Sequence, residues 1–315
     1  MSTTSATWNP RSFGITVAGL VLLGGVVWYY TSVVSDGIGN QARASTPSAS
    51  SLMAAAERGD IAAIEAEIKR SGTAAIDRPR ESSGGQTELT PLMAAASAGK
   101  PDAVRALIKN GAQPNVRSKD GRTALMYASG WGDAATVRAL LDSQARVDER
   151  SEMRMTALSF AAARGELDSL RALIDAGADV NAKNRWGQTP LIIACLAGDA
   201  TKVVALLNAG ANVNDLDNDR KTALAVAAGA ETGLEAVRAL ISAKADPNLA
   251  DAEGVTPLMV AADKGDAEKV MALLDAGANV KIADRAGRTA ADWATARADD
   301  EGAKVLKALT EAQAR

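Results

Sequence analysis

The feature that most constrains the fold is a phrase that returns about every 33 residues. It first reads Thr90-Pro91-Leu92-Met93-Ala94-Ala95-Ala96-Ser97-Ala98-Gly99, and one later step is 34 residues instead of 33. The same Thr-[Pro/Ala]-Leu start recurs at Thr123, Thr156, Thr189, Thr222 and Thr256, with a degenerate form at Thr289. A fixed period of this size is typical of stacked repeats, in which each unit buries its apolar face only against its neighbours.

Each unit has the same internal order of local signals. Thr followed by Pro fits the start of a helix, because Thr can cap free amides and Pro has no amide to lose. A short Ala-rich helix follows, and then a second helix with apolar residues at helical spacing, such as Val104, Leu107 and Ile108. This second helix is predicted to end at a Gly that adopts the left-handed conformation, as at Gly111 or Gly177. A polar segment with turn-forming residues, such as 115–122, then leads to the next Thr.

Residues 177–191 resemble the ankyrin repeat almost letter for letter, and the resemblance extends over about residues 50–315 in about eight units. It implies an all-α solenoid of helix-turn-helix units with β-hairpin loops. One departure is consistent, because the chain contains no His and the family's His after Thr-Pro-Leu is always replaced. The replacements are Met93, Met126, Ser159, Ile192, Ala225, Met259 and Asp292.

Composition limits the other classes of protein. The net charge of -3 and the pI near 5.3 argue against a general nucleic-acid binder, which is normally basic. The single Cys excludes an intrachain disulfide framework and a multi-Cys metal site. Because a solenoid grows by adding units, residues 51–315 are interpreted as one repeat domain.

Residues 13–34 form an uncharged, apolar run of 22 residues that follows an N-terminal tail, residues 1–12. As a helix this run extends about 33 Å, enough to span a bilayer core. Trp28, Tyr29 and Tyr30 near its far end suit the membrane interface. The alternative is a signal peptide cleaved after residues 42–44, Ala-Arg-Ala, but the run is longer than usual and the candidate site lies well beyond it. The sequence therefore predicts one uncleaved transmembrane helix.

The orientation of this helix follows from the charges that flank it. Arg11 and the free amine lie on one side, and Asp36 and Arg43 on the other, which favours a cytoplasmic N-terminus. Residues 35–50 are rich in Ser, Thr, Ala and Pro and are interpreted as a flexible linker. An Ala-rich chain with a short N-terminal anchor resembles a bacterial inner-membrane protein whose repeat domain lies in the periplasm.

Residues suited to catalysis or metal binding are scarce. Without His there is no Cys-His or Ser-His arrangement, and Cys195 is interpreted as a small buried hydrophobe. Three carboxylates alternate as in a calcium-binding loop, but Arg220 and Val226 replace the Gly and Glu that such a loop requires. The three are Asp215, Asp217 and Asp219. An acidic hairpin is therefore preferred over a calcium site, and no catalytic residue, metal or cofactor is expected.

The resemblance implies that partners are held by hairpin tips and by the ends of the first helices, which line a concave surface. Apolar side chains and flanking Arg residues at these positions favour a protein-binding patch, since such residues concentrate at interface centres. The predicted partner-binding residues are Trp131, Met153, Met155, Arg164, Arg185, Trp186 and Leu196. Two alternatives stay open: Trp131 could cover a neighbouring helix, and Met155 could fill the turn where Arg154 replaces Gly. Tyr127, Phe160 and Trp293 are interpreted as core.

These observations lead to one functional hypothesis. The chain is expected to be a membrane-anchored, non-catalytic interaction protein that binds another protein on its concave face, as an envelope accessory or assembly factor. No nucleic acid and no small-molecule substrate is expected. Two alternatives are an immunity-type inhibitor of a toxin or lipase and, in a different class, an enzyme that uses surface carboxylates.

Overall fold

The computed structural model describes residues 51–73, 76–78, 80–81, 88–295 and 299–314. The predicted tail 1–12, transmembrane helix 13–34 and linker 35–50 lie outside these residues, as do Trp28, Tyr29 and Tyr30. Among the helices that are described, none is both long and apolar enough to cross a bilayer.

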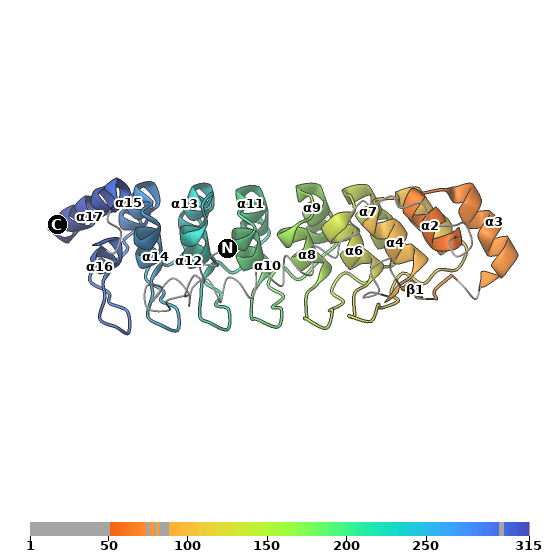
Figure 1. Ribbon diagram of the computed structural model, residues 1–315, viewed down its shortest axis with the longest axis horizontal. Coiled ribbons are helices and arrows are strands. Elements are labelled where there is room, and N and C mark those ends of the chain that lie inside the picture. Colours follow the sequence, from red (N-terminus) through yellow and green to blue (C-terminus); the bar gives the residue numbers. More distant parts are fainter. Residues whose placement is uncertain (1–50, 74–75, 79, 82–87, 296–298, 315) are drawn as a thin grey trace, which may run out of the picture. The chain divides into compact units, whose positions relative to one another are not determined.

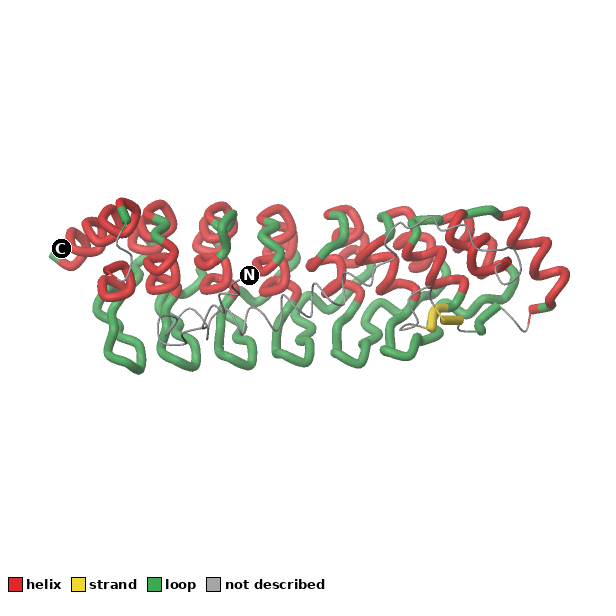
Figure 2. The backbone as a smooth tube through the Cα atoms, in the orientation of Figure 1, coloured by secondary structure: helices red, strands yellow, loops and turns green. Residues whose placement is uncertain are grey.

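Sixteen helices of the described residues form eight consecutive pairs, which we number as units 1 to 8. The first helices are α2 (Ser51–Arg58), α4 (Pro91–Ser97), α6 (Ala124–Trp131), α8 (Ala157–Ala163), α10 (Pro190–Leu196), α12 (Ala223–Gly229), α14 (Pro257–Lys264) and α16 (Ala290–Thr295). The second helices are α3 (Ile61–Ser71), α5 (Pro101–Lys109), α7 (Ala134–Asp142), α9 (Leu167–Asp175), α11 (Ala200–Asn208), α13 (Leu234–Ser242), α15 (Ala267–Asp275) and α17 (Asp300–Gln313). The pairs stand side by side, and the loops between units project along one edge (Figures 1 and 2). This arrangement confirms the predicted stack of about eight units.

The first helices begin where the recurring Thr predicts. In units 2 to 7 the Thr side chain accepts a hydrogen bond from the amide three residues later, as from Met93 N to Thr90 Oγ1 (3.3 Å). In two units another side chain makes a hydrogen bond from the position where the family has His. The side chains of Ser159 and Asp292 accept a hydrogen bond from the amide of the preceding Thr at 3.4 and 2.7 Å. The cap therefore persists without the imidazole.

The ends of the second helices also match the prediction. Gly111, Gly177, Gly210 and Gly277 have φ angles of 103°, 82°, 86° and 88°, in the left-handed region that glycine adopts at little cost.

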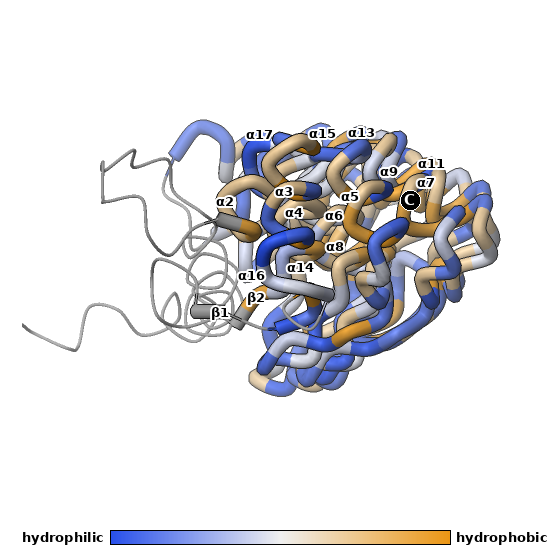
Figure 3. Tube along the Cα trace, turned by 90° about the vertical axis from the view of Figure 1, so that its right-hand side faces the viewer, coloured by the Kyte–Doolittle hydropathy of each residue, from blue (hydrophilic) through white to orange (hydrophobic). Residues whose placement is uncertain are grey.

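The core consists of layers contributed by every unit. The Leu of the Thr-[Pro/Ala]-Leu start is at most 1% exposed in units 2 to 7. Facing it are the apolar residues of the second helices, which are fully buried at Val104, Val137, Leu170, Val203, Val237 and Val270. Figure 3, which looks along the row of helices, shows hydrophilic residues concentrated on the loops and apolar residues among the helices. Each buried Leu or Val contributes about 2 kcal/mol to folding, and most of it requires a neighbouring unit.

Successive loops are joined by two series of hydrogen bonds. An Asn or Asp side chain of one unit accepts a bond from a backbone amide of the next, as from Arg146 N to Asn115 Oδ1 and from Asn212 N to Asn181 Oδ1 (both 2.8 Å). At the loop tips, backbone amides bond to the preceding loop, as from Glu152 N to Asp120 O (3.0 Å). The loops therefore form a continuous, regularly spaced edge.

The loops differ from the predicted β-hairpins in one respect. They are closed by backbone bonds, such as Asn184 N to Gln188 O (3.0 Å), but most are turns without strands. The strands found in the described residues are β1 (Arg80–Glu81) and β2 (Glu88–Leu89), which pair antiparallel, with an isolated bridge between Ala283 and Thr289. The closing segments are too short to extend a ladder between loops.

The 34-residue step coincides with a buried lysine. Its extra residue lies in the loop after α12, and the Nζ of Lys269 donates a hydrogen bond to the Ala230 carbonyl in that loop. Lys269 is 1% exposed and also forms an ion pair with Asp266 at 2.9 Å. A buried ammonium group is tolerated because both partners are supplied.

The loop contacts predict that two glycines with similar backbones respond differently to Ala. Gly177 (φ 82°) has open space where a Cβ would lie, whereas at Gly187 (φ 76°) the Cβ would lie 2.5 Å from Asn218 Oδ1 and 2.8 Å from Asn218 N. Gly177→Ala should cost about 1 kcal/mol, the strain of a left-handed residue. Gly187→Ala should cost about 2 kcal/mol more because it also pushes two loops apart. Denaturant unfolding measures both, and equal losses would contradict the proposed coupling between loops.

Candidate functional site

Units 3 and 4 contain a cluster of three aromatic rings and two guanidinium groups, which we call the Trp131 cluster. It comprises Arg122, Tyr127, Trp131, Phe160 and Arg164. The ring centroid of Trp131 lies 5.8 Å from that of Tyr127 and 5.7 Å from that of Phe160 in the next unit. The Arg122 guanidinium lies 5.2 to 5.8 Å from all three ring centroids, and Arg164 lies 5.6 Å from Trp131. Arginine at this distance from aromatic rings is attracted by their negative faces.

The loop before α6 holds Arg122 in this position. Its Nε forms an ion pair with Asp120 at 2.7 Å, and the Ser118 hydroxyl in turn donates to the Asp120 carboxylate. The Arg122 backbone amide donates to Ser118 Oγ at 3.0 Å. Because Arg122 is only 8% exposed, it works as part of the scaffold of the cluster and leaves Trp131 at the surface, where it is partly exposed.

Burial shifts the ionisation of two groups around this cluster. It raises the pKa of the Tyr127 phenol, and the nearby Asp120 carboxylate adds to the shift while Arg122 and Ser118 oppose it. Partial burial also lowers the pKa of Arg164. Both shifts favour the uncharged form of the group, because burial penalises charge.

Four buried polar side-chain atoms of the described residues have no hydrogen-bond partner, and all four lie in units 3 and 4. They are Tyr127 Oη, Trp131 Nε1, Thr136 Oγ1 and Ser169 Oγ. Ser118 and Arg122 lie near the Tyr127 hydroxyl, but neither makes an aligned hydrogen bond with it. A buried polar group without a partner costs about 1–3 kcal/mol. Such departures from full hydrogen bonding are expected at functional sites rather than in a repeating framework.

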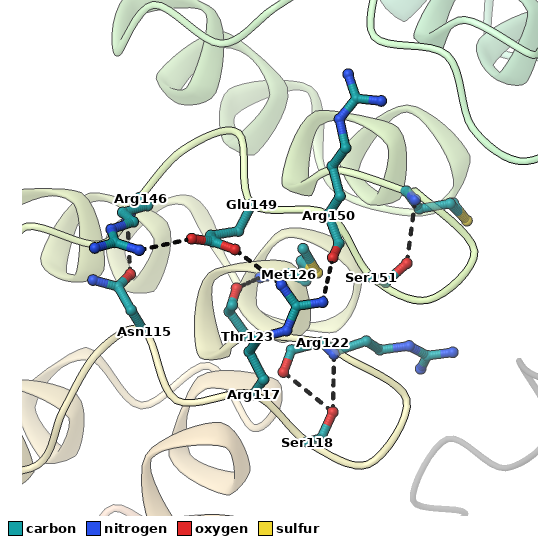
Figure 4. Close-up of polar contacts among 11 residues, drawn as sticks. Asn115, Arg117, Ser118, Arg122, Thr123, Met126, Arg146, Glu149, Arg150 and Ser151 are labelled. Carbon is teal, nitrogen blue, oxygen red and sulfur yellow. Dashed lines mark hydrogen bonds and ion pairs between the residues drawn. The ribbon is translucent and has the colours of Figure 1, made fainter.

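A separate polar network fixes the spacing of the loops in units 3 and 4. Arg117 donates from Nη1 to Glu149 Oε2 (3.0 Å) and from Nη2 to the Arg150 carbonyl (2.7 Å), both in the next unit. Glu149 is also bound by Arg146 at 3.1 Å. Figure 4 shows the Arg122 side chain extending away from this network. Arg117 therefore joins the loops, while Arg122 is left to contact the rings.

The structure places most of the predicted partner-binding residues on one face. Met153, Trp186 and Leu196 are partly exposed, and Arg164 and Arg185 are exposed. We call this surface the Trp131 face. It consists of loops 118–122, 151–155 and 184–188 together with α6, α8, α10 and the residue that follows each helix. No observation of the structure alone tests partner binding by these residues, which stays a prediction.

The prediction that Met155 contacts a partner is wrong, because this residue is 2% exposed and belongs to the core. It occupies the position directly before the Thr cap, which is also buried at Arg122 and Gln188. The structure supports the interpretation in which Met155 fills the turn, and Trp131 also covers part of a neighbouring helix, since its ring lies 5.7 Å from that of Phe160 in α8 while it stays partly exposed. Sequence reasoning also missed Arg122 as the scaffold of the cluster: its place before Thr123 was visible, but its contact with Phe160, 38 residues later, was not.

The three aromatic residues interpreted as core differ in their exposure. Tyr127 and Phe160 are buried at 6% and 5% exposure, as predicted. The interpretation of Trp293 as core is wrong, because it is partly exposed and its Nε1 donates to Asp284 Oδ2 at 3.1 Å. Arg288, which precedes Thr289 as Arg122 precedes Thr123, lies 4.5 Å from the Trp293 ring centroid and bonds to the same carboxylate. Unit 8 therefore repeats the arginine-aromatic contact, but with its indole nitrogen satisfied.

The residues weighed for chemistry have structural contacts. Cys195 is 1% exposed, as predicted, and burial raises the pKa of its thiol to about 12, so it stays protonated. Asp217 accepts hydrogen bonds from the amides of Asp219 (3.0 Å) and Lys221 (2.8 Å) and so closes its own loop. The Oδ1 atom of Asp215 lies 3.7 Å from the Nζ of Lys183, with which it forms an ion pair. The part of the chain that the structure describes holds no group of three or more His, Cys, Asp or Glu arranged to bind a metal ion.

Comparison with known proteins agrees with the architecture. The sequence profile of the family described as "Ankyrin repeats (3 copies)" matches residues 52–151, 92–184, 158–251 and 229–314. Together these matches cover most of the chain. No curated protein matches the sequence as a whole or in part.

The contacts of Asp284 predict a pH-dependent stability of unit 8. Burial opposes ionisation of Asp284, but hydrogen bonds from Arg288 and Trp293 and the charge of Arg288 outweigh it and lower the pKa. A lowered pKa stabilises the fold fully above the unfolded value of about 3.9, and this contribution is lost as the pH falls from that value through the lowered pKa of the folded state. Asp284→Asn should therefore cost about 2 kcal/mol near neutral pH, and this cost should shrink as the pH falls through the lowered pKa of Asp284. Thermal unfolding checks this, with the exposed Asp275→Asn as control; a pH-independent loss would refute it.

Proposed function

Because the chain belongs to the ankyrin-repeat family, whose repeats are protein-protein interaction modules, we propose that it binds a protein partner through the Trp131 face. The proposal adds a location to the family's general role. It assigns binding to units 3 to 5 and no catalytic step to the chain.

The observation that carries the proposal is the Trp131 cluster. Protein interfaces are dominated by a few aromatic and Arg residues held rigidly at their centre. Trp131 meets this description, because Tyr127, Phe160 and Arg122 fix its ring while part of it stays exposed. A rigid side chain loses little conformational entropy on binding, so more of the contact energy appears as affinity.

The surroundings of Trp131 continue the candidate surface into units 4 and 5. Met153, Trp186 and Leu196 belong to the loops and helix ends of units 4 and 5, and each is partly exposed. The amide of Arg185 donates to the Met153 carbonyl at 2.9 Å, and the amide of Asn218 donates to the Trp186 carbonyl at 3.0 Å. The loops that present these side chains are therefore already held at the spacing needed to contact one partner.

We further propose that the chain acts at a membrane, as an envelope accessory or assembly factor. The support is the uncharged run 13–34 and the Ser/Thr/Ala/Pro-rich linker 35–50, which would let the repeats extend from the surface. In this interpretation the repeat domain lies in the periplasm of a bacterium and meets its partner there. Protease accessibility of the repeats in intact spheroplasts tests the orientation, and complete protection would exclude it.

The variants Trp131→Ala and Trp186→Ala separate packing from binding. Trp131→Ala should destabilise the protein by about 2 kcal/mol, because two ring contacts are lost, whereas Trp186→Ala should cost less than about 1 kcal/mol. Both should reduce capture of the partner that co-purifies with the full-length chain. The control is Trp293→Ala, a partly exposed Trp of unit 8 that should lower stability without loss of capture. Undiminished capture by both Trp131→Ala and Trp186→Ala would refute the proposal.

Photo-crosslinking tests the location of the binding surface directly. A benzophenone side chain at Met153 or Leu196 should crosslink to the partner, because both positions lie on the Trp131 face. Matched probes at Val204 and Met271, which are 43% and 50% exposed on second helices, should not. Crosslinks confined to Val204 or Met271 would place the partner on the opposite side of the stack.

A further inference from the structure

The charges of the loop side of the stack are distributed unevenly. The Trp131 face carries five positive and two negative side chains, in a chain whose net charge is -3. The positive residues are Lys119, Arg122, Arg154, Arg164 and Arg185, and the negative residues are Asp120 and Glu152. The equivalent segments of units 6 to 8 are loops 217–221, 251–255 and 284–288 with α12, α14 and α16. They carry five positive and seven negative side chains.

Three of the cations on the Trp131 face have no ionic partner within the described residues. Lys119, Arg154 and Arg185 are exposed at the tips of three successive loops, and none forms an ion pair there. Most other Arg residues of the loops are paired, as Arg117 is with Glu149 and Arg288 with Asp284. The tips are adjacent, since Glu152 N bonds to Asp120 O and Arg185 N to Met153 O. The unpaired charges therefore line one continuous edge of the Trp131 face, and Arg122 from the first of these loops contacts Trp131.

Arg154 is held at a position that suits glycine better. Its φ angle is 57°, and the equivalent residues of units 3, 5, 7 and 8 are glycines with φ between 75° and 81°. A side chain in this left-handed region costs about 1 kcal/mol. Arg220 occupies the same position in unit 6 with φ 62°, but there Asp217 and Asp219 lie in the same loop. Arg154 thus adds positive charge to the edge at a backbone cost.

We propose that the segment bound by the Trp131 face is an acidic polypeptide that inserts an apolar or aromatic side chain beside Trp131. The inference rests on the proposed function and specifies the chemistry of its partner. The acidic groups of the segment pair with Lys119, Arg154 and Arg185, while its apolar side chain packs against Trp131, Met153 and Trp186. Complementary charge accelerates association and selects the partner, whereas the apolar contact supplies most of the affinity.

A polypeptide fits this surface better than a nucleic acid. Nucleic-acid binding depends on many phosphate contacts along an extended basic surface, whereas this edge carries three unpaired cations with Glu152 exposed among them, on a chain that is acidic as a whole. Trp131 and Trp186 present aromatic rings, but Met153 and Leu196 of the same face are aliphatic, offer no stacking surface for bases and suit the apolar side chain of a polypeptide.

The test measures binding of full-length protein, purified in a non-ionic detergent, to an immobilised random copolymer of Glu and Tyr. A Lys-Tyr copolymer and a short single-stranded DNA serve as comparison probes. The Glu-Tyr copolymer should bind, and its binding should be weaker at high salt than at low salt because salt screens the charges. The double variant Arg154→Gly/Arg185→Gln should bind it about ten-fold more weakly, as expected for two lost ion pairs.

A matched double variant, Arg220→Gly/Arg285→Gln, removes the same number of charges at the equivalent positions of units 6 and 8. Like the first variant, it replaces an Arg in the left-handed conformation with Gly. It should change the affinity for the Glu-Tyr copolymer less than about two-fold. Neither double variant should lower the melting temperature, so a loss of binding is not a loss of folding. The inference is overturned by equal effects of the two variants, by equal binding of both copolymers, by tighter binding of DNA, or by no binding of the Glu-Tyr copolymer.

The two proposals fail in different ways. If Arg154→Gly/Arg185→Gln retains the benzophenone crosslinks from Met153 and Leu196 at full yield, the face binds a protein but does not select an acidic one. If those crosslinks are absent from the wild-type chain as well, the proposed binding surface itself is wrong.

Discussion

The structure depends on contact between neighbouring units. A single helix pair is too small to bury its apolar side chains alone, and residues such as Leu158 and Val137 are fully buried within the stack. The same dependence holds for the loops, where Asn181 and Asn115 bind the backbone of the following unit. A surface built in this way has no independent parts. Each loop tip is positioned by the one before it, so side chains from several units are presented together and in a fixed order.

The Trp131 cluster stands out against this regular framework. Most positions have the same contacts in every unit, whereas in this cluster Arg122 lies among three rings and the Tyr127 hydroxyl and the Trp131 indole nitrogen have no hydrogen-bond partner. Unit 8 shows that the fold can satisfy such a contact fully, because Asp284 binds both Arg288 and Trp293. Ser118 occupies the place of Asp284 in unit 3 and cannot bind both groups. The difference lies in the local sequence and not in the architecture, which is why we connect it with function.

The period of the sequence was enough to predict the parts of the fold that depend on local chemistry. The Thr caps, the terminal glycines and the layers of Leu follow from the preferences of single residues and from helical spacing. Interactions between units were harder to predict. Arg122 contacts Phe160, which lies 38 residues later, and Lys269 reaches Ala230, 39 residues earlier. Such pairings depend on which side chains of different units come into contact. A repeat pattern predicts only which backbone segments lie next to each other. Met155 was assigned to the surface because it lies in a loop. It occupies the position directly before the Thr cap, which is also buried in the neighbouring units at Arg122 and Gln188.

The central claim is that loops and first-helix ends of units 3 to 5 form one binding surface. Oxidative footprinting of the full-length chain, alone and with its co-purified partner, tests it most directly because exposed Met and Trp side chains report their own accessibility. The account predicts that oxidation of Met153 and Trp186 falls several-fold on binding while oxidation of Met271, on the second helix of unit 7, does not change. Protection of Met271 with Met153 and Trp186 left as reactive as before would contradict it.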